Sequence, residues 1–150
     1  MIVDIKLLNP DCMPIKGTEG AIGFDVKANI SEPVSIKAGE IKLIPLGFCI
    51  DLKEPEVGMM LYMRSGLANK QGLMLTNSVG VVDSDYRGEV MASIWNTGTR
   101  TEEFIVNPLD RIGQVVFHRA ADIGFNIVAN LSDTTRGTGG FGSTGVKGYN

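Results

Sequence analysis

The sequence has neither an excess of positive charge nor a long apolar stretch, which nucleic-acid-binding and membrane proteins commonly require. Its 14 basic and 17 acidic residues give a formal net charge of −3, so no overall positive field exists to hold nucleic acid. No apolar stretch approaches the ~20 residues of a membrane-spanning helix. The segment Met1–Pro10 carries Asp4 and Lys6 within a short apolar run, which is unlike a signal peptide. We therefore expect neither a nucleic-acid partner nor a membrane location.

Cysteine and histidine are also scarce. Cys12 and Cys49 stand in no metal-binding or redox spacing, which favours two reduced thiols. We expect an intracellular, cytoplasmic protein, or one in the host cell interior if a virus encodes it. His118 is the only histidine and has no visible catalytic partner, so we interpret it as structural. If the ligand is a polyanion, its positive partners must be a few placed arginines and a metal.

Glycine, by contrast, is abundant, with 19 residues in a chain of 150. Short apolar runs rich in β-branched residues alternate with turn signals, which predicts a single all-β domain, a distorted β-barrel of the jelly-roll type. One short helix is expected from an N-cap at Ser65 through Gln71, ending at Gly72. The predicted strands are Ile2–Leu8, Val34–Ile36, Ile41–Leu52, Met59–Met63, Val79–Val82, Val90–Trp95, Phe104–Val106, Ile112–Phe117 and Ile123–Val128.

The C-terminal end differs in composition from the body. From Ser132 to Gly145 only Phe141 offers much to bury, and Arg136 stands among glycines and hydroxyl residues. We expect a jelly-roll domain over residues 1–131 and a flexible glycine-rich tail over residues 132–150. Composition alone indicates a flexible terminus, but the same residues suit a flap whose backbone N–H groups hold phosphate oxygens.

Two polar clusters stand out from the apolar runs. Asp83–Gly88 lies between two predicted strands, which predicts a β-hairpin. One of its carboxylates could act as a general base while the other is held in an ion pair. Arg64–Gly66 opens the predicted helix, where unpaired N–H groups and a guanidinium fork suit an anion. Taken alone, each cluster could equally be an ordinary turn or helix cap.

Taken together and in order, five motifs make the chain resemble the trimeric dUTPase family over nearly its whole length. The resemblance implies magnesium-dependent hydrolysis of dUTP to dUMP and pyrophosphate. That reaction keeps uracil out of DNA and supplies dUMP for thymidylate synthesis. The third and fifth motifs are long and specific. The five motifs are Gly23–Asp25, Arg64–Ala68, Gly80–Gly88, Arg111–Gln114 and Arg136–Gly145.

The resemblance assigns roles to individual residues. Asp83 matches the general base that activates the water attacking the α-phosphorus, and Tyr86 matches the residue that packs against the deoxyribose. Asp25 matches a carboxylate that holds Mg²⁺ through bound waters. Asp85 and Arg111 are expected to form a structural ion pair. The remaining residues matched to contacts with uracil or the triphosphate are Arg64, Ser65, Gly66, Asn77, Gly80, Val82, Gln114, Arg136, Phe141, Gly142, Ser143 and Thr144.

The resemblance also implies a homotrimer with three active sites, each shared between subunits. Two alternatives stay open. A dUTPase fold could serve chiefly as a nucleotide-gated binding protein, although every expected catalytic position is filled. A dCTP deaminase is similar in fold, but it needs a glutamate ten residues after Asp83, where this chain has Ser93, so deamination is less favoured.

Overall fold

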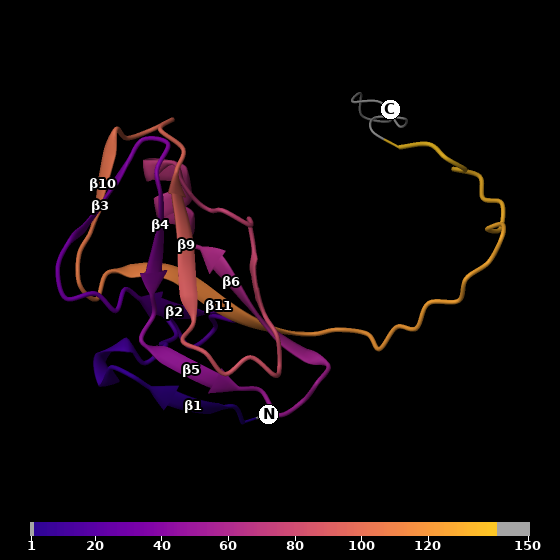
Figure 1. The fold of residues 1–150 in the computed structure, drawn as a ribbon, viewed down its shortest axis with the longest axis horizontal. Coiled ribbons are helices and arrows are strands. Elements are labelled where there is room, and N and C mark those ends of the chain that lie inside the picture. Colours follow the sequence, from indigo (N-terminus) through magenta and orange to yellow (C-terminus); the bar gives the residue numbers. More distant parts are fainter. Residues whose placement is uncertain (1, 141–150) are drawn as a thin grey trace.

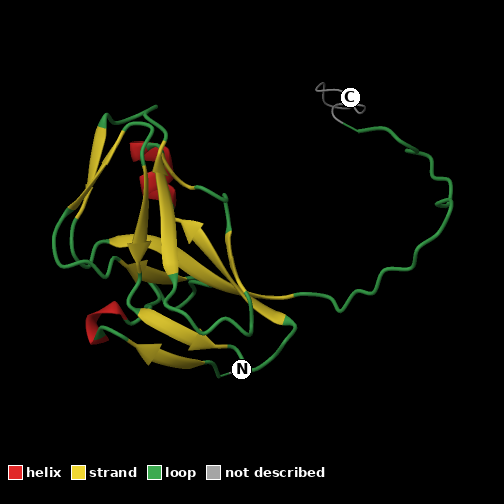
Figure 2. Cartoon of the chain, viewed as in Figure 1, coloured by secondary structure: helices red, strands yellow, loops and turns green. Residues whose placement is uncertain are grey.

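Strands dominate the computed structural model, which describes residues 2–140 (Figure 1). The described chain contains eleven strands in four antiparallel sheets, and two short helical turns, η1 (Pro10–Cys12) and η2 (Leu67–Gln71) (Figure 2). The expected all-β fold of the jelly-roll type is confirmed. The strands are β1 (Asp4–Leu7), β2 (Phe24–Lys27), β3 (Val34–Lys37), β4 (Ile41–Pro45), β5 (Phe48–Asp51), β6 (Val57–Met63), β7 (Leu73–Leu75), β8 (Gly80–Val82), β9 (Met91–Asn96), β10 (Glu103–Val106) and β11 (Arg111–Arg119).

Two sheets supply most of the hydrophobic core. One has the strand order β2-β11-β6-β8 and the other β4-β9-β7. Alternate residues of β6 and β9 are buried, because successive side chains of a strand point to opposite faces. Met59, Leu61 and Ile94 are among the inward side chains, none more than 2% exposed. Burying each such side chain stabilises the fold by about 1.5–3 kcal/mol.

The single strand expected over Ile41–Leu52 is divided into β4 and β5. The chain turns at Gly47, whose φ of 77° lies in the left-handed region that glycine adopts without strain. A side chain at this position would lie 2.7 Å from Cys12 Cβ, so the packing also requires glycine. Leu46 at the corner is fully buried, so the apolar pattern continues across the turn and the sequence does not indicate where the strand ends.

The prediction of a β-hairpin around Asp83–Gly88 is wrong. β8 pairs with β6, whereas β9 pairs with β4 and β7. Residues 83–90 are therefore a loop that passes from one sheet to another, and we call them the crossing loop. Two further strands, β2 and β7, were not predicted, because one carries two charged residues and the other is only three residues long.

The helical turn differs from its prediction at the start. Gly66, with helical dihedral angles, precedes the turn and no side chain caps it, so the assignment of Ser65 as N-cap is wrong. The end at Gly72 is confirmed. Gly72 has a φ of 71° and its N–H donates to Ala68 O at 3.1 Å, which closes the turn in the usual way.

No strand follows β11 in the described chain. After Ala120 the chain leaves the body as an extended arm (Figure 1), so the strand expected over Ile123–Val128 is wrong for a single chain. Phe125 and Ile127 are 95% and 97% exposed. Up to residue 140, the only hydrogen bonds within residues 121–140 are local turns. A strand needs a neighbour for its N–H and C=O groups, and this segment has none among residues 2–140.

The two cysteines are free thiols, as expected. Burial raises the pKa of the Cys12 thiol, which favours its protonated and unreactive form. Within residues 2–140, no helix is long and apolar enough to cross a membrane.

Asn96 is the only buried polar residue among those described, and it joins β9 to β3. Its Nδ2 donates to Ile36 O at 2.9 Å, and its Oδ1 accepts from Gly98 N at 3.0 Å.

We expect Asn96→Ala to lower the free energy of unfolding by about 1–3 kcal/mol, because a buried carbonyl loses its donor. Denaturant unfolding measures this. The exposed control Asn69→Ala should stay within ~0.5 kcal/mol of the parent chain, and equal losses in both variants would contradict the expectation.

Candidate active site

A pocket of about 410 Å³ lies where the end of β6 meets β2 and β11. The strand register places Gln114 of β11 between Tyr62 of β6 and Asp25 of β2. Arg64 and Ser65 follow β6 directly and reach the same place. The pocket, which we call the arginine pocket, is lined by Gly17, Thr18, Ala21, Ile22, Gly23, Asp25, Arg64, Ser65, Arg111 and Gln114.

Two arginines share one carboxylate in the arginine pocket. Arg111 Nη1 lies 3.0 Å from Asp25 Oδ2, and Arg64 Nε lies 3.4 Å from Asp25 Oδ1. The Asp25 side chain is only 15% exposed. Two positive charges against one negative leave the group net positive, and each guanidinium retains further N–H donors. The arrangement therefore suits an anion with several oxygens, such as a phosphate chain.

Neutral polar groups complete the arginine pocket. A side chain at residue 23 would lie 3.0 Å from Gln114 Oε1, so Gly23 leaves space for that amide. Ser65 is exposed, and the space around the α-carbon of Gly66 is open. The structure thus brings together five of the predicted residues, Asp25, Arg64, Ser65, Arg111 and Gln114.

The crossing loop carries a second group of predicted residues. Tyr86 N–H donates to Asp83 O at 3.2 Å, and the Tyr86 hydroxyl donates to Glu89 O at 3.0 Å. The ring folds back over Gly88, where a side chain would lie 2.6 Å from Tyr86 Cζ. Asp83 is exposed, and its carboxylate makes no hydrogen bond or ion pair with any residue that the structure describes.

Asn77, Gly80 and Val82 lie on the segment that leads into the crossing loop. Asn77 O accepts from Val79 N at 2.7 Å, which makes a tight turn before β8. Gly80 lies opposite Leu61, and a side chain at Gly80 would lie 3.1 Å from Leu61 Cβ. Glycine therefore allows β8 to approach β6 closely at this point.

The arginine pocket and the crossing loop lie at opposite ends of β6. Val82 pairs with Met59 near the start of that strand, whereas Arg64 follows its end. At about 3.3 Å per residue, the five steps along the strand from Met59 to Arg64 span roughly 17 Å. In a single chain, Asp83 and Tyr86 therefore do not line the arginine pocket.

Several expected contacts take a different form or fall outside the structure. Arg111 pairs with Asp25 and not with Asp85 within the described chain, because β11 and β2 are neighbours and Asp85 lies at the far end of β6. Arg136 is exposed on the arm. The remaining tail residues, Phe141, Gly142, Ser143 and Thr144, lie outside the described residues.

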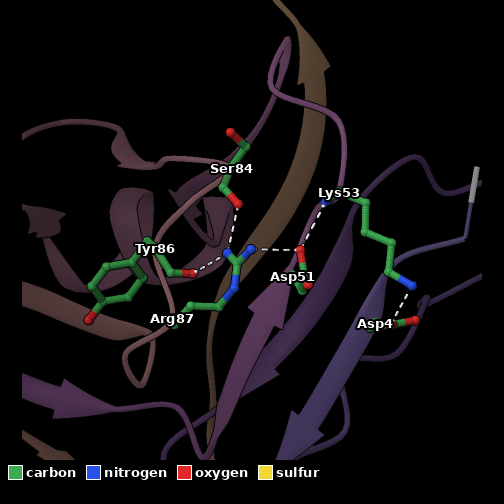
Figure 3. A network of polar contacts seen from close by, with 6 residues as sticks. All are labelled: Asp4, Asp51, Lys53, Ser84, Tyr86 and Arg87. Atoms are coloured by element: carbon green, nitrogen blue, oxygen red, sulfur yellow. Dashed lines mark hydrogen bonds and ion pairs between the residues drawn. The ribbon is translucent and has the colours of Figure 1, made fainter.

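Three residues to which no role was assigned hold the crossing loop in place. Arg87 Nη2 lies 2.8 Å from Asp51 Oδ1 (Figure 3). Glu89 Oε1 accepts from Gly47 N at 2.8 Å and from Asn29 Nδ2 at 3.2 Å. Asp51 lies within the apolar run Ile41–Leu52, and nothing in the local sequence indicates a contact with a residue 36 positions away.

Comparison with known proteins agrees with the motifs. The family profile described as dUTPase matches residues 10–145. The chain belongs to the dUTPase family. It is 45% identical over 146 residues to the deoxyuridine 5'-triphosphate nucleotidohydrolase of Hahella chejuensis, an alignment covering 97% of this chain and 95% of that protein.

Solved dUTPase structures share its fold. The dUTPase from Streptococcus mutans is 29% identical, with a TM-score of 0.71, covering 81% of this chain and 98% of that chain. The Staphylococcus bacteriophage 80alpha dUTPase, solved with dUPNHPP, is 22% identical, with a TM-score of 0.86, covering 97% of this chain and 99% of that chain.

We expect the substitution Gly88→Ala to displace the Tyr86 ring. Because the added Cβ would lie 2.6 Å from Tyr86 Cζ, the ring must rotate and lose its hydrogen bond to Glu89 O. A crystal structure of the variant checks this. Gly66→Ala is the matched control, because its Cβ meets nothing within 4 Å. An unmoved Tyr86 ring in Gly88→Ala would contradict the expectation.

Proposed function

We propose that this protein hydrolyses dUTP to dUMP and pyrophosphate. Relatives 45% and 43% identical to it carry the name deoxyuridine 5'-triphosphate nucleotidohydrolase. The observation that carries the proposal is the arginine pocket, in which Arg64 and Arg111 flank one carboxylate and leave donors for a phosphate chain. Two free thiols suit a reducing compartment, so we place the reaction in the cytoplasm.

Asp83 is the proposed general base. Its exposed carboxylate has no partner in the part of the chain that the structure describes, so its oxygens are available to a water molecule. As a proton passes from the water to Asp83, the water oxygen bonds to the α-phosphorus. The bond between that phosphorus and the bridging oxygen breaks, and pyrophosphate leaves.

The nucleoside is proposed to bind along β8 and the crossing loop. Tyr86 packs against the deoxyribose and leaves no room for a 2′-hydroxyl, while Asn77, Gly80 and Val82 contact uracil. A site built on such hydrogen bonds discriminates well, because a wrong base leaves buried polar groups unpaired.

The triphosphate is proposed to bind in the arginine pocket and under the tail. Arg64, Ser65, Gly66 and Gln114 supply charge and hydrogen-bond donors to its oxygens. The tail over residues 132–150 then closes as a flap and excludes water. In that flap Arg136 clamps the γ-phosphate, Phe141 stacks on uracil, and Gly142, Ser143 and Thr144 add hydrogen bonds.

Asp25 fits Mg²⁺ held through water rather than directly. Within residues 2–140, no group of three His, Cys, Asp or Glu side chains could hold a metal ion, which argues against an all-protein cage. Two arginines occupy the Asp25 carboxylate, and about two of its roughly four acceptor positions remain for metal-bound waters. Mg²⁺ keeps several waters and commonly binds substrate phosphates. When bound, the ion offsets negative charge on the phosphate oxygens.

A homotrimer with three shared active sites is proposed, because the arginine pocket and the crossing loop do not meet within one chain. A site that uses both takes the pocket from one subunit and the loop from another. The arm offers a further contact between subunits. Its exposed Ile123, Phe125 and Ile127 alternate with the period of a strand, and a neighbouring subunit would supply the missing partner.

The reaction is tested by pyrophosphate release with Mg²⁺ from dUTP, dCTP, dTTP and UTP separately. We expect selective cleavage of dUTP, and for Asp83→Asn a loss in kcat of about 10²–10⁴-fold, because asparagine cannot accept the proton. Asp11→Asn, another exposed carboxylate, is the matched control and should keep its activity. Binding of dUTP without cleavage of any nucleotide would sink the proposal and favour a nucleotide-gated binding protein. Ammonia release from dCTP would favour a deaminase.

Shared sites are tested by complementation between two inactive variants. Arg64→Gln removes the pocket arginine and Asp83→Asn removes the base, so each alone should be nearly inactive. Coexpressed in equal amounts, they should recover about a quarter of the parent activity, because half of the pockets and half of the loops are intact and combine at random. If each site lay within one chain, the mixture would stay as inactive as its components.

A further inference from the structure

A single guanidinium group holds the middle of the crossing loop. Arg87 Nη1 donates to Ser84 O at 2.8 Å and to Tyr86 O at 3.2 Å (Figure 3). These carbonyls stand on either side of Asp85, so the Arg87 side chain folds the loop upon itself. The other two hydrogen bonds of Tyr86, to Asp83 O and Glu89 O, also stay within the loop.

Asp51 ties this guanidinium to a different part of the barrel. Arg87 Nη2 lies 2.8 Å from Asp51 Oδ1, at the end of β5. The same oxygen accepts from Lys53 N at 3.1 Å, which fixes the carboxylate, and the Lys53 ammonium pairs with Asp4 of β1 (Figure 3). The loop is thereby joined to the β1–β5 sheet, although the strands that flank it, β8 and β9, belong to two other sheets.

We propose that Arg87 and Asp51 are positioning residues that set the geometry of Asp83 and Tyr86. The proposal rests on the proposed hydrolysis of dUTP, in which those two loop residues meet the substrate. Because β8 and β9 do not pair, no hairpin ladder holds the loop together. Its described backbone hydrogen bonds are the turn from Tyr86 N to Asp83 O and those of Val90 with Leu46 and Phe48, so the segment between depends largely on side-chain contacts. Glu89 anchors only the end that leads into β9.

The geometry of the guanidinium decides which residue can serve here. Its planar fork reaches two loop carbonyls and one carboxylate at once, which the single ammonium of a lysine cannot do. The Arg87 and Asp51 side chains are 54% and 38% exposed. Exposed ion pairs add little to stability, so removing this one should disturb the loop without unfolding the barrel.

Steady-state kinetics with dUTP and UTP separate a positioning role from a merely structural one. For Arg87→Gln and Asp51→Ala we expect kcat with dUTP to fall about tenfold, since small displacements of reacting groups cost this much or more. The preference for dUTP over UTP in kcat/KM should also fall, because the Tyr86 ring is no longer held. Arg87→Lys should behave like Arg87→Gln. Asp4→Asn breaks only the outer pair with Lys53 and should match the parent chain.

Hydrogen exchange without nucleotide gives a readout that does not depend on activity. Amides of residues 84–88 should exchange faster in Arg87→Gln and Asp51→Ala than in the parent chain and in Asp4→Asn. If the parent chain cleaves no dUTP, the proposed function fails. Hydrogen exchange then still tests whether Arg87 and Asp51 hold the crossing loop in place. Unchanged exchange would overturn the positioning role. If the parent chain is active, unchanged kcat and an unchanged preference for dUTP over UTP in both variants would also overturn the positioning role.

Discussion

The antiparallel register of β6 is the constraint on which the arrangement of the site depends. β8 and β11 pair with this strand from its two sides, with Val82 opposite Met59 and Gln114 opposite Tyr62. Ladder hydrogen bonds fix that register, and a slip of one residue would turn every buried side chain of β6 outward. No side-chain rotation can therefore bring Asp83 to the arginine pocket within one chain. The same strand that builds the core also keeps the two halves of the site apart.

The apolar surface of the chain is consistent with this separation. Ile41 and Met74 both pair with Trp95 across the β4-β9-β7 sheet, so all three point to the same outer face. They are 37–56% exposed, and the side chains of the arm are more exposed still. Exposed apolar side chains that share one face suit a contact with another protein surface. The proposed homotrimer would supply such a surface.

Much of the fold could be predicted from apolar runs of strand length. The runs Met59–Met63 and Ile112–Phe117 lie within β6 and β11, because an apolar run of strand length is a local property of the sequence. The strand predictions fail where contacts between distant residues determine the structure. The corner at Gly47 depends on Cys12 packing against it. Ile123–Val128 has the pattern of a strand but no partner in the part of its own chain that the structure describes.

For the site, the motifs alone identify which chemical groups are present, since Arg64, Ser65, Gln114 and Asp25 stand in segments that resemble those of dUTPases. Which of these groups meet became clear from the folded chain. It paired Arg111 with Asp25, and it set Asp51 against Arg87. Motifs report only residue type and local spacing. Contacts between distant residues depend on strand register and side-chain direction, which no local pattern carries.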